Sequence, residues 1–226
     1  MKYYHQHPKH LVAVDCVIFG YDEGTLCLLS YPRGFEPSKG AWSLMGGFVL
    51  DGESSDDAAM RVLKQTTGLG NIFMSQVATF TTHDREPEAR VISIVYYALI
   101  RMEEHDKACV KEHGAYWWPI SQLPELIFDH DQMVKQAIEK LQREAGYRLI
   151  GHELLGEKFT MSQLRKLYET IFMREFDPGN FRKKILSLDV LERLNEKDIS
   201  ESRKGAFYYR SKRELTKRGL DRIVKV

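Results

Sequence analysis

Two kinds of hydrophobic pattern divide the chain, and the first is typical of β-strands. Residues 11–32 predict a β-hairpin, because two runs rich in Val, Ile and Leu flank the turn-forming sequence YDEGT. Residues 40–49 predict a third strand that ends in paired glycines. Further strands are predicted at 71–82 and 89–101, on either side of the polar loop HDREPE.

Two helices are predicted among these strands. Residues 54–68 have Ser54 or Ser55 as a cap, aspartates in the first turn and Gly68 as a stop. Residues 115–144 contain a short strand, a turn and a long amphipathic helix. Strands mixed with two helices over roughly 140 residues predict an α+β sandwich.

The second pattern has helical spacing and begins after a linker at residues 145–159. Thr160 is a predicted cap of a helix whose apolar residues recur at i, i+3, i+4, i+7 and i+8. A second helix is predicted at 180–189 and a third helical stretch at 189–197. Residues 198–215 then predict a β-hairpin with a basic turn.

Charge separates the same two regions. Residues 1–146 hold 14 Lys and Arg against 20 Asp and Glu, a net of −6, whereas residues 147–226 hold 19 against 12, a net of +7. A basic region of this kind favours a polyanionic partner over a merely solvated surface. The alternative is a small helical interaction domain with a charged surface.

The order of elements in the basic region predicts a winged helix-turn-helix that binds double-stranded operator DNA. The second helix would enter the major groove, and the basic hairpin would lie on the phosphate backbone as a wing. The predicted DNA contacts are Thr160, Asn180, Arg182, Lys183, Lys184, Arg203, Lys204 and Arg210.

The remaining composition predicts a cytoplasmic protein. Three cysteines without a CxxC pair indicate reduced thiols rather than a disulfide framework. The apolar stretch near the N-terminus is short and is broken by Asp15, which argues against a signal peptide. No apolar run approaches the roughly 20 residues of a membrane span, so no membrane partner is expected.

Residues 46–69, called the box segment below, resemble the Nudix box G-x5-E-x7-R-E-U-x-E-E-x-G-U, in which U is a bulky apolar residue. Gly47, Glu53, Arg61, Gly68 and Leu69 match its framework. The three helical glutamates of that box would lie close together on one helix face, where they suit Mg²⁺ and a pyrophosphate substrate.

This sequence has Val62, Gln65 and Thr66 at the three glutamate positions. Valine offers no metal ligand, and the other two side chains are neutral. We therefore expect no catalytic residues, no metal and no cofactor. An active hydrolase of nucleoside diphosphate derivatives, with unorthodox ligands, is the alternative.

A cleft beside the box segment would survive the loss of the metal. Aromatic faces with a few converging hydrogen-bonding groups are typical of small-molecule pockets. The residues predicted to contact an effector are Tyr31, Arg33, Trp42, Glu53, His83 and Arg90.

Over nearly its whole length the chain resembles the NrtR-type Nudix-related transcription regulators of bacteria. The resemblance rests on AVDCVIF, RVISIVYYALI, FDHDQM and NFRKKIL. It implies a degenerate Nudix domain for effector binding and dimerisation at 1–146, a DNA-binding domain at 147–226, and a homodimeric repressor.

Members of that family respond to ADP-ribose or to sugars such as arabinose. The missing metal cluster favours a pentose, most simply L-arabinose, with ADP-ribose as the alternative. An inert dimerisation module on a ligand-independent DNA-binding protein is a further alternative.

Overall fold

The computed structural model describes residues 3–22, 24–68, 72–102, 114–200 and 204–212. The chain forms two compact units. The first comprises Met1–Phe19, Leu28–Ala98 and His105–Ala137, and the second comprises Gly20–Cys27, Leu99–Glu104 and Ile138–Val226. Each is described by itself.

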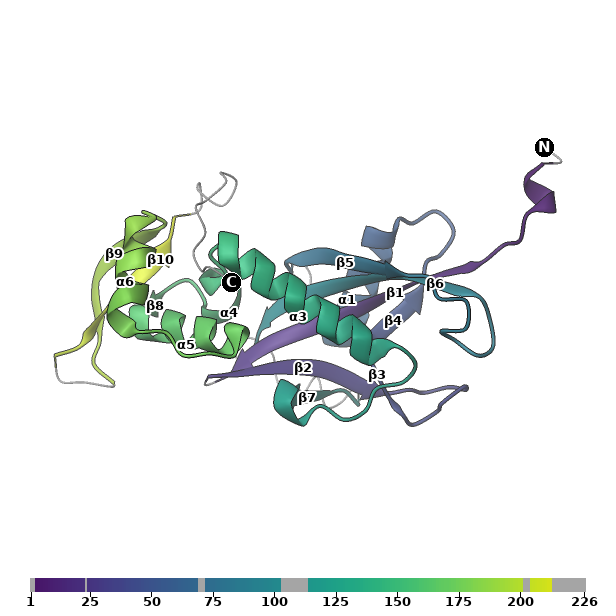
Figure 1. Cartoon of the computed structure of the whole chain (residues 1–226), viewed down its shortest axis with the longest axis horizontal. Coiled ribbons are helices and arrows are strands. Elements are labelled where there is room, and N and C mark those ends of the chain that lie inside the picture. The colour runs from purple at the N-terminus through teal and green to yellow at the C-terminus, as the bar shows by residue number, and fades with distance from the viewer. Residues whose placement is uncertain (1–2, 23, 69–71, 103–113, 201–203, 213–226) are drawn as a thin grey trace. The chain divides into compact units, whose positions relative to one another are not determined.

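The strands of the first unit form a mixed sheet (Figure 1). Its path runs β3-β2-β1-β6-β5, with β4 beside β1 and β7 beside β2. The strands are β1 (Leu11–Asp22), β2 (Thr25–Pro32), β3 (Trp42–Ser43), β4 (Met45–Phe48), β5 (Met74–Phe80), β6 (Val91–Arg101) and β7 (Tyr116–Pro119). The predicted hairpin at 11–32 is confirmed as β1 and β2.

The single strand predicted at 40–49 is wrong, because the segment divides into β3 and β4 at Leu44. The Leu44 backbone N–H donates to Nδ1 of His130 at 3.2 Å instead of to a neighbouring strand. On either side, β3 pairs with β2 and β4 pairs with β1. A side chain 86 positions away therefore breaks this strand.

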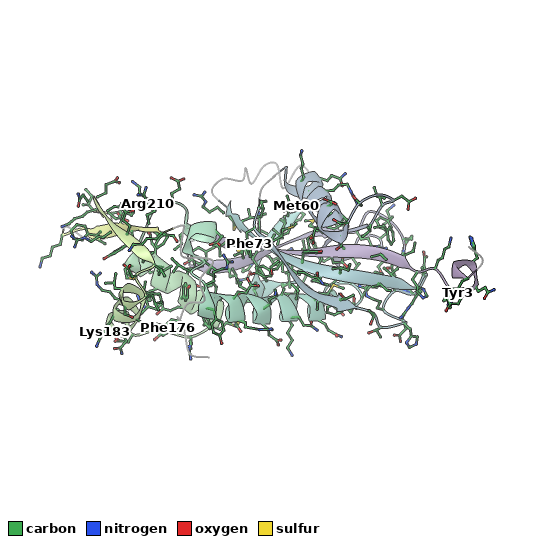
Figure 2. All side chains as sticks on the ribbon, turned by 90° about the horizontal axis from the view of Figure 1, so that it is seen from above. Tyr3, Met60, Phe73, Phe176, Lys183 and Arg210 are labelled. Atoms are coloured by element: carbon green, nitrogen blue, oxygen red, sulfur yellow. The ribbon has the colours of Figure 1, made fainter. Side chains whose placement is uncertain are left out.

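Helix α1 (Ser55–Thr67) confirms the predicted helix of the box segment. Ser54 accepts a hydrogen bond from the Asp57 backbone and Asp57 reciprocates, which closes a capping box, and Gly68 ends the helix in the left-handed conformation. Helix α3 (His130–Tyr147) confirms the long amphipathic helix. Figures 1 and 2 show α1, which carries Met60, and α3 on opposite sides of the strands, so the predicted sandwich is confirmed. The short helices η1 (Tyr4–Gln6) and η3 (Ile120–Gln122) complete the elements described in this region.

The second unit contains the helices α4 (Gly151–Leu155), α5 (Met161–Phe172) and α6 (Pro178–Ser187). A small sheet in the order β8-β10-β9 accompanies them. Its strands are β8 (Phe159–Thr160), β9 (Leu191–Asp198) and β10 (Ala206–Ser211). Helix, turn, helix and hairpin follow one another as in a winged helix.

Two predictions for this unit are wrong. The third helical stretch at 189–197 is strand β9, because it pairs with β10 from Leu191 to Asp198. Pairing across the hairpin overrides the helix preference of its Leu, Glu and Lys residues. The segment at 145–159 is not a plain linker, since it holds the end of α3 and all of α4. Gly151 of α4 packs so tightly that a Cβ would lie 2.9 Å from both Leu164 and Phe159.

The core of the second unit includes the fully buried Tyr168 of α5. Its ring meets Phe181 of α6 edge-on at 5.6 Å, and its hydroxyl donates to the Arg148 carbonyl. Helix α5 also receives the Gln142 side chain, whose amide donates to the Ile171 carbonyl at 2.9 Å. The Thr170 hydroxyl of the same helix donates to the Gly24 carbonyl, also at 2.9 Å. Within the described ranges, no helix is both long and apolar enough to span a bilayer.

Candidate effector pocket and nucleic-acid interface

The glutamate of the box segment, Glu53, forms an ion pair with the arginine of the same segment, Arg61. Glu53 accepts hydrogen bonds from Arg61 at 2.6 and 3.1 Å and from the Leu50 backbone at 2.7 Å. The bonds from Arg61, followed by the Leu50 bond, lower the pKa of Glu53. The carboxylate therefore stays charged and holds the loop against the helix.

The neighbouring positions do not fit Mg²⁺. Val62 is buried and packs over Gly47, where an added Cβ would lie 3.0 Å from the valine methyl. The Thr66 hydroxyl donates back to the carbonyls of its own helix. Asp56 accepts a 2.5 Å hydrogen bond from Tyr96. Among the residues that the structure describes, no three His, Cys, Asp or Glu side chains group to hold a metal.

A cavity of about 250 Å³ opens beside the first residues of the box segment, where Gly46, Gly47 and Phe48 line it. Its polar floor is a cluster of buried ionisable groups. Arg85 binds Asp129 in a fork with distances of 3.0 and 2.8 Å, and one of its nitrogens lies 3.9 Å from Asp15. Asp15 also accepts a 2.5 Å hydrogen bond from Ser93. This cluster leaves the other Asp15 oxygen, Oδ1, near the Nε2 atom of His130 at 3.9 Å.

His130 is neutral in this setting and its proton has a defined place. Burial lowers the pKa of His130, against the opposite effect of the nearby Asp15 and Asp129 carboxylates. Because Nδ1 accepts the Leu44 N–H, the proton of the neutral ring lies on Nε2. The cavity thus has one N–H donor beside one carboxylate acceptor.

Glycine allows the carboxylate to reach this position. A Cβ on Gly46 would lie only 2.4 Å from Asp15 Oδ1. Gly46 and Gly47 both line the cavity, so part of the box glycines' role is to open space for Asp15 and for a ligand.

The rim of the cavity is aromatic. Arg33 lies 4.1 Å from the centre of the Phe35 ring and 5.3 Å from that of Phe128. Its guanidinium also pairs with Glu86 at 3.4 Å. Burial, and then the Asp15 carboxylate, raise the pKa of Tyr31, which keeps its hydroxyl protonated. Aromatic faces and paired charges around a neutral donor suit a polar ligand with ring-like faces.

The structure brings only two of the six predicted effector residues into this cavity, Tyr31 and Arg33. Trp42 packs edge-on against Tyr116 and Trp118. Glu53 belongs to the box segment, and the His83 side chain is 84% exposed. Arg90 does not line the cavity either. None of these four residues lines this cavity, and an effector contact by any of them stays a prediction.

Sequence reasoning missed Asp15, Arg85, Phe128 and His130. One signal was present, since Asp15 is a charged residue inside the apolar run AVDCVIF. A charge at a strand position whose neighbours are buried requires a partner. The partners themselves lie far apart in the chain, Arg85 in a loop and His130 at the start of α3, and only the tertiary fold brings them to Asp15.

The second site is the exposed face of α6. Asp177 caps this helix by accepting from the Asn180 backbone at 2.8 Å, and Pro178 occupies its first turn. Phe181 and Ile185 are buried, whereas Asn180, Arg182, Lys183 and Lys184 are exposed. Figure 2 shows Lys183 on the outer side of α6. No described residue forms an ion pair with Lys183 or Lys184, so this face has uncompensated positive charge.

The other predicted DNA contacts differ in position. Thr160 caps α5 in a capping box with Gln163 and is only 3% exposed, so its role is structural and it offers DNA almost no surface. Arg182 donates to the Tyr209 hydroxyl at 3.2 Å, and Arg210 pairs with Glu192 at 2.8 Å. Lys204 is exposed beside the hairpin turn. Arg203 lies outside the described residues.

Comparison with known proteins decides the family. Residues 9–141 match the NUDIX domain, and residues 151–211 match the NrtR DNA-binding winged helix domain. The chain belongs to the Nudix family, in its NrtR-type form. The winged helix prediction is confirmed. The protein is a DNA-binding transcription regulator.

Its relatives include regulators and an enzyme. The ADPR responsive transcriptional repressor NtrR of Acinetobacter baylyi is 28% identical over 89% of this chain and 82% of its own length. The ADP-ribose pyrophosphatase of Methanocaldococcus jannaschii is 34% identical over 60% of this chain and 77% of its own length.

A solved structure of Shewanella oneidensis NrtR with a 27mer DNA has a TM-score of 0.83 and 27% identity, covering 93% of this chain and 97% of that one. The Nudix domain of that same protein has also been solved with ADP ribose, with a TM-score of 0.50 and 27% identity over 61% of this chain and 92% of that one. Three of these four matches are named for ADP-ribose and none of the four for a free sugar, so they do not support our expectation of a pentose.

Proposed function

We propose that this protein is a transcriptional repressor whose Nudix domain senses a metabolite that contains a pentose ring. The winged helix binds operator DNA, and occupancy of the cavity changes its affinity for that DNA. The observation that carries this proposal is the cavity floor, where the Asp15 carboxylate lies beside the Nε2 atom of His130. A carboxylate acceptor and a neutral N–H donor suit the adjacent hydroxyls of a sugar.

ADP-ribose is the first candidate effector, because a relative along 89% of the chain is named for it and a similar Nudix domain has been solved with it. The ribose ring would occupy the cavity, and the remainder of the molecule would extend past its rim. The volume of about 250 Å³ suits a single sugar, since cavities that enclose larger ligands span roughly 300–1,000 Å³.

A free pentose such as L-arabinose is the second candidate, and the charge balance favours it. Arg33 and Arg85 line the cavity, but each already faces a carboxylate, Glu86 and Asp129 respectively. The described lining therefore offers no uncompensated cation to a diphosphate. A neutral sugar needs only hydrogen bonds and an aromatic face.

Two continuous elements support coupling of the cavity to the winged helix. Strand β1 contributes Ala13 and Asp15 to the cavity, and its last residues belong to the second unit. Helix α3 begins with His130 and continues from Ile138 as part of the second unit. A ligand that binds one arrangement of these elements better than another changes DNA affinity, and DNA changes ligand affinity by the same factor.

Calorimetry with ADP-ribose, D-ribose and L-arabinose tests the effector. Asp15→Asn should lower the affinity for the ligand roughly 10- to 100-fold, which corresponds to the loss of a hydrogen bond to a charged acceptor. His83→Asn, at an exposed position outside the cavity, is the matched control and should bind as the unmodified protein does. Binding of ADP-ribose alone favours the first candidate, and binding of a free sugar favours the second. Absence of binding by all three would contradict the effector assignment.

Coupling is tested with a labelled duplex that the protein selects from a random library. The ligand identified by calorimetry should weaken binding of this duplex in the unmodified protein and in His83→Asn, and should do so much less in Asp15→Asn. Equal DNA affinity with and without bound ligand would contradict regulation by this cavity and would favour the inert-module alternative.

We also propose that the Nudix domain is catalytically inactive and that the protein acts as a homodimer. Inactivity follows from the occupied Glu53 and the apolar Val62. A homodimer would present two α6 helices to two half-sites about one helical turn apart. Sedimentation of the protein with and without the selected duplex measures the number of copies bound.

A further inference from the structure

We propose that Leu186 of α6 reads the methyl group of a thymine in the major groove. This inference rests on the proposed binding of operator DNA. It assigns a sequence-reading role to an apolar residue on a helix where only polar and charged residues were expected to contact DNA.

Helix geometry places Leu186 on the face available to DNA. Successive residues turn by about 100°, and α6 buries Phe181 and Ile185. The direction opposite these two residues falls on Lys183, with Leu186 about 60° to one side of it and Ser187 about 40° to the other. Leu186 is 41% exposed, so a large part of its side chain meets solvent when DNA is absent.

The neighbours of Leu186 distinguish it from an ordinary surface leucine, which by itself requires no explanation. Arg182 and Lys183 precede it by four and three residues, so all three share one surface of the helix. Both basic side chains are exposed. A leucine between two cations on this helix would be brought against a base edge when the cations meet phosphates or guanines.

The chemistry of the major groove names the partner. Its base edges present hydrogen-bond donors and acceptors, and the thymine C5-methyl is the apolar group among them. A leucine side chain cannot form hydrogen bonds with these donors and acceptors, but its apolar contact with a methyl group is favourable because it removes both from water. The operator should therefore carry, in each half-site, a thymine whose methyl matters to affinity.

The test begins with a duplex selected by the unmodified full-length protein from a random library. Each thymine is then replaced singly by deoxyuridine, which removes the methyl and keeps the base pair. At one position per half-site, binding should weaken by about fourfold, the effect of burying one carbon group. In Leu186→Ala, thymine and deoxyuridine at that position should bind equally.

Two control variants isolate the side chain. Leu186→Met keeps an apolar side chain and should keep the sensitivity to the methyl. Ser187→Ala changes the adjacent exposed position, whose hydroxyl donates to the Lys184 carbonyl of the same helix, and should also keep it. Circular dichroism should show unchanged helix content in all three variants, since both changed positions are exposed.

Each other outcome overturns the inference. Leu186 does not read a methyl if Leu186→Ala loses as much affinity on removal of the thymine methyl as the unmodified protein does. The same holds if no thymine replacement changes the affinity of the unmodified protein. In both cases sequence-specific DNA binding stands. If the protein selects no sequence at all, the proposed DNA-binding function fails together with this inference.

Discussion

The cavity of the first unit and the outer face of α6 handle charge in opposite ways. At the cavity, the buried Arg85 is paired with Asp129, whose side chain is 14% exposed, and Arg33 is paired with Glu86. On α6, Lys183 and Lys184 are exposed, and no residue in the described ranges forms an ion pair with them. A ligand of the cavity meets a site whose charges are already balanced, whereas a ligand of α6 meets net positive charge.

This difference separates two modes of recognition. A balanced, buried site discriminates by shape and hydrogen bonds, because adding or removing a charge there carries a large desolvation cost. An exposed, unbalanced helix attracts any polyanion, and sequence preference must come from groups such as Asn180 or Leu186 that touch base edges. The four predictions below test this contrast.

The largest effect is expected for Arg85→Ala. Its side chain is 3% exposed, and its removal leaves the carboxylates of Asp129 and Asp15 without their cation. The free energy of unfolding should fall by about 3–5 kcal/mol, as for one partner lost from a buried pair. Urea denaturation measures this. A loss as small as that of Lys158→Ala, which breaks the exposed pair with Glu196, would show that the cluster is not a buried charge network.

A smaller effect, visible in salt dependence, is expected for DNA binding. Lys183→Ala and Lys184→Ala should each weaken binding of the selected duplex. If each side chain contacts one phosphate, each change lowers the slope of log affinity against log salt by about one unit. Fluorescence anisotropy between about 50 and 200 mM salt measures the slope. Lys64→Ala, at an exposed position of α1, should leave the slope unchanged.

A still smaller effect is expected from pH. Burial lowers the pKa of His130 in the folded protein, although Asp15 and Asp129 oppose this and Arg85 and Arg33 add to it. The neutral His130 side chain therefore makes its full contribution to the free energy of unfolding above about pH 6.5, the pKa of histidine in the unfolded chain. This contribution is lost as the pH falls below that value toward the lower pKa of His130 in the folded protein. The free energy of unfolding should decrease with falling pH, and less steeply in His130→Asn. The exposed His83→Asn should retain the full dependence, and an identical dependence in both variants would exclude His130 as the cause.

The last prediction is that the protein has no hydrolase activity toward ADP-ribose. The protein with Mg²⁺ or Mn²⁺ should release no product from ADP-ribose, because Glu53 is held by Arg61 and Val62 replaces a ligand. Release of AMP, measured chromatographically beside an active ADP-ribose pyrophosphatase, gives the comparison, because cleavage of the pyrophosphate bond yields AMP and ribose 5-phosphate. Turnover that Glu53→Gln abolishes would mean that the box segment still binds metal.

Several features of this protein were determined by the sequence itself. The hairpin at 11–32, the capped helix of the box segment and the capped helix after Thr160 depend on local patterns of apolar residues, caps and glycines, and all three were predicted. The missing glutamates at Val62, Gln65 and Thr66 were also readable directly. The basic second helix of the tail was predicted because Phe181 and Ile185 repeat at helical spacing between cations.

Tertiary structure alone decided the cavity and the identity of β9. Asp15, Arg85 and His130 lie on a strand, a loop and a helix start, and no local pattern indicates that they meet. Trp42 and His83 had suitable chemistry, but packing turned Trp42 toward Tyr116 and Trp118 and left His83 in solvent. Residues 189–197 have helix-favouring composition, yet they form a strand because β10 supplies hydrogen-bond partners. Local patterns set the free energy of a single segment, whereas pairing and burial depend on partners that are distant in the chain.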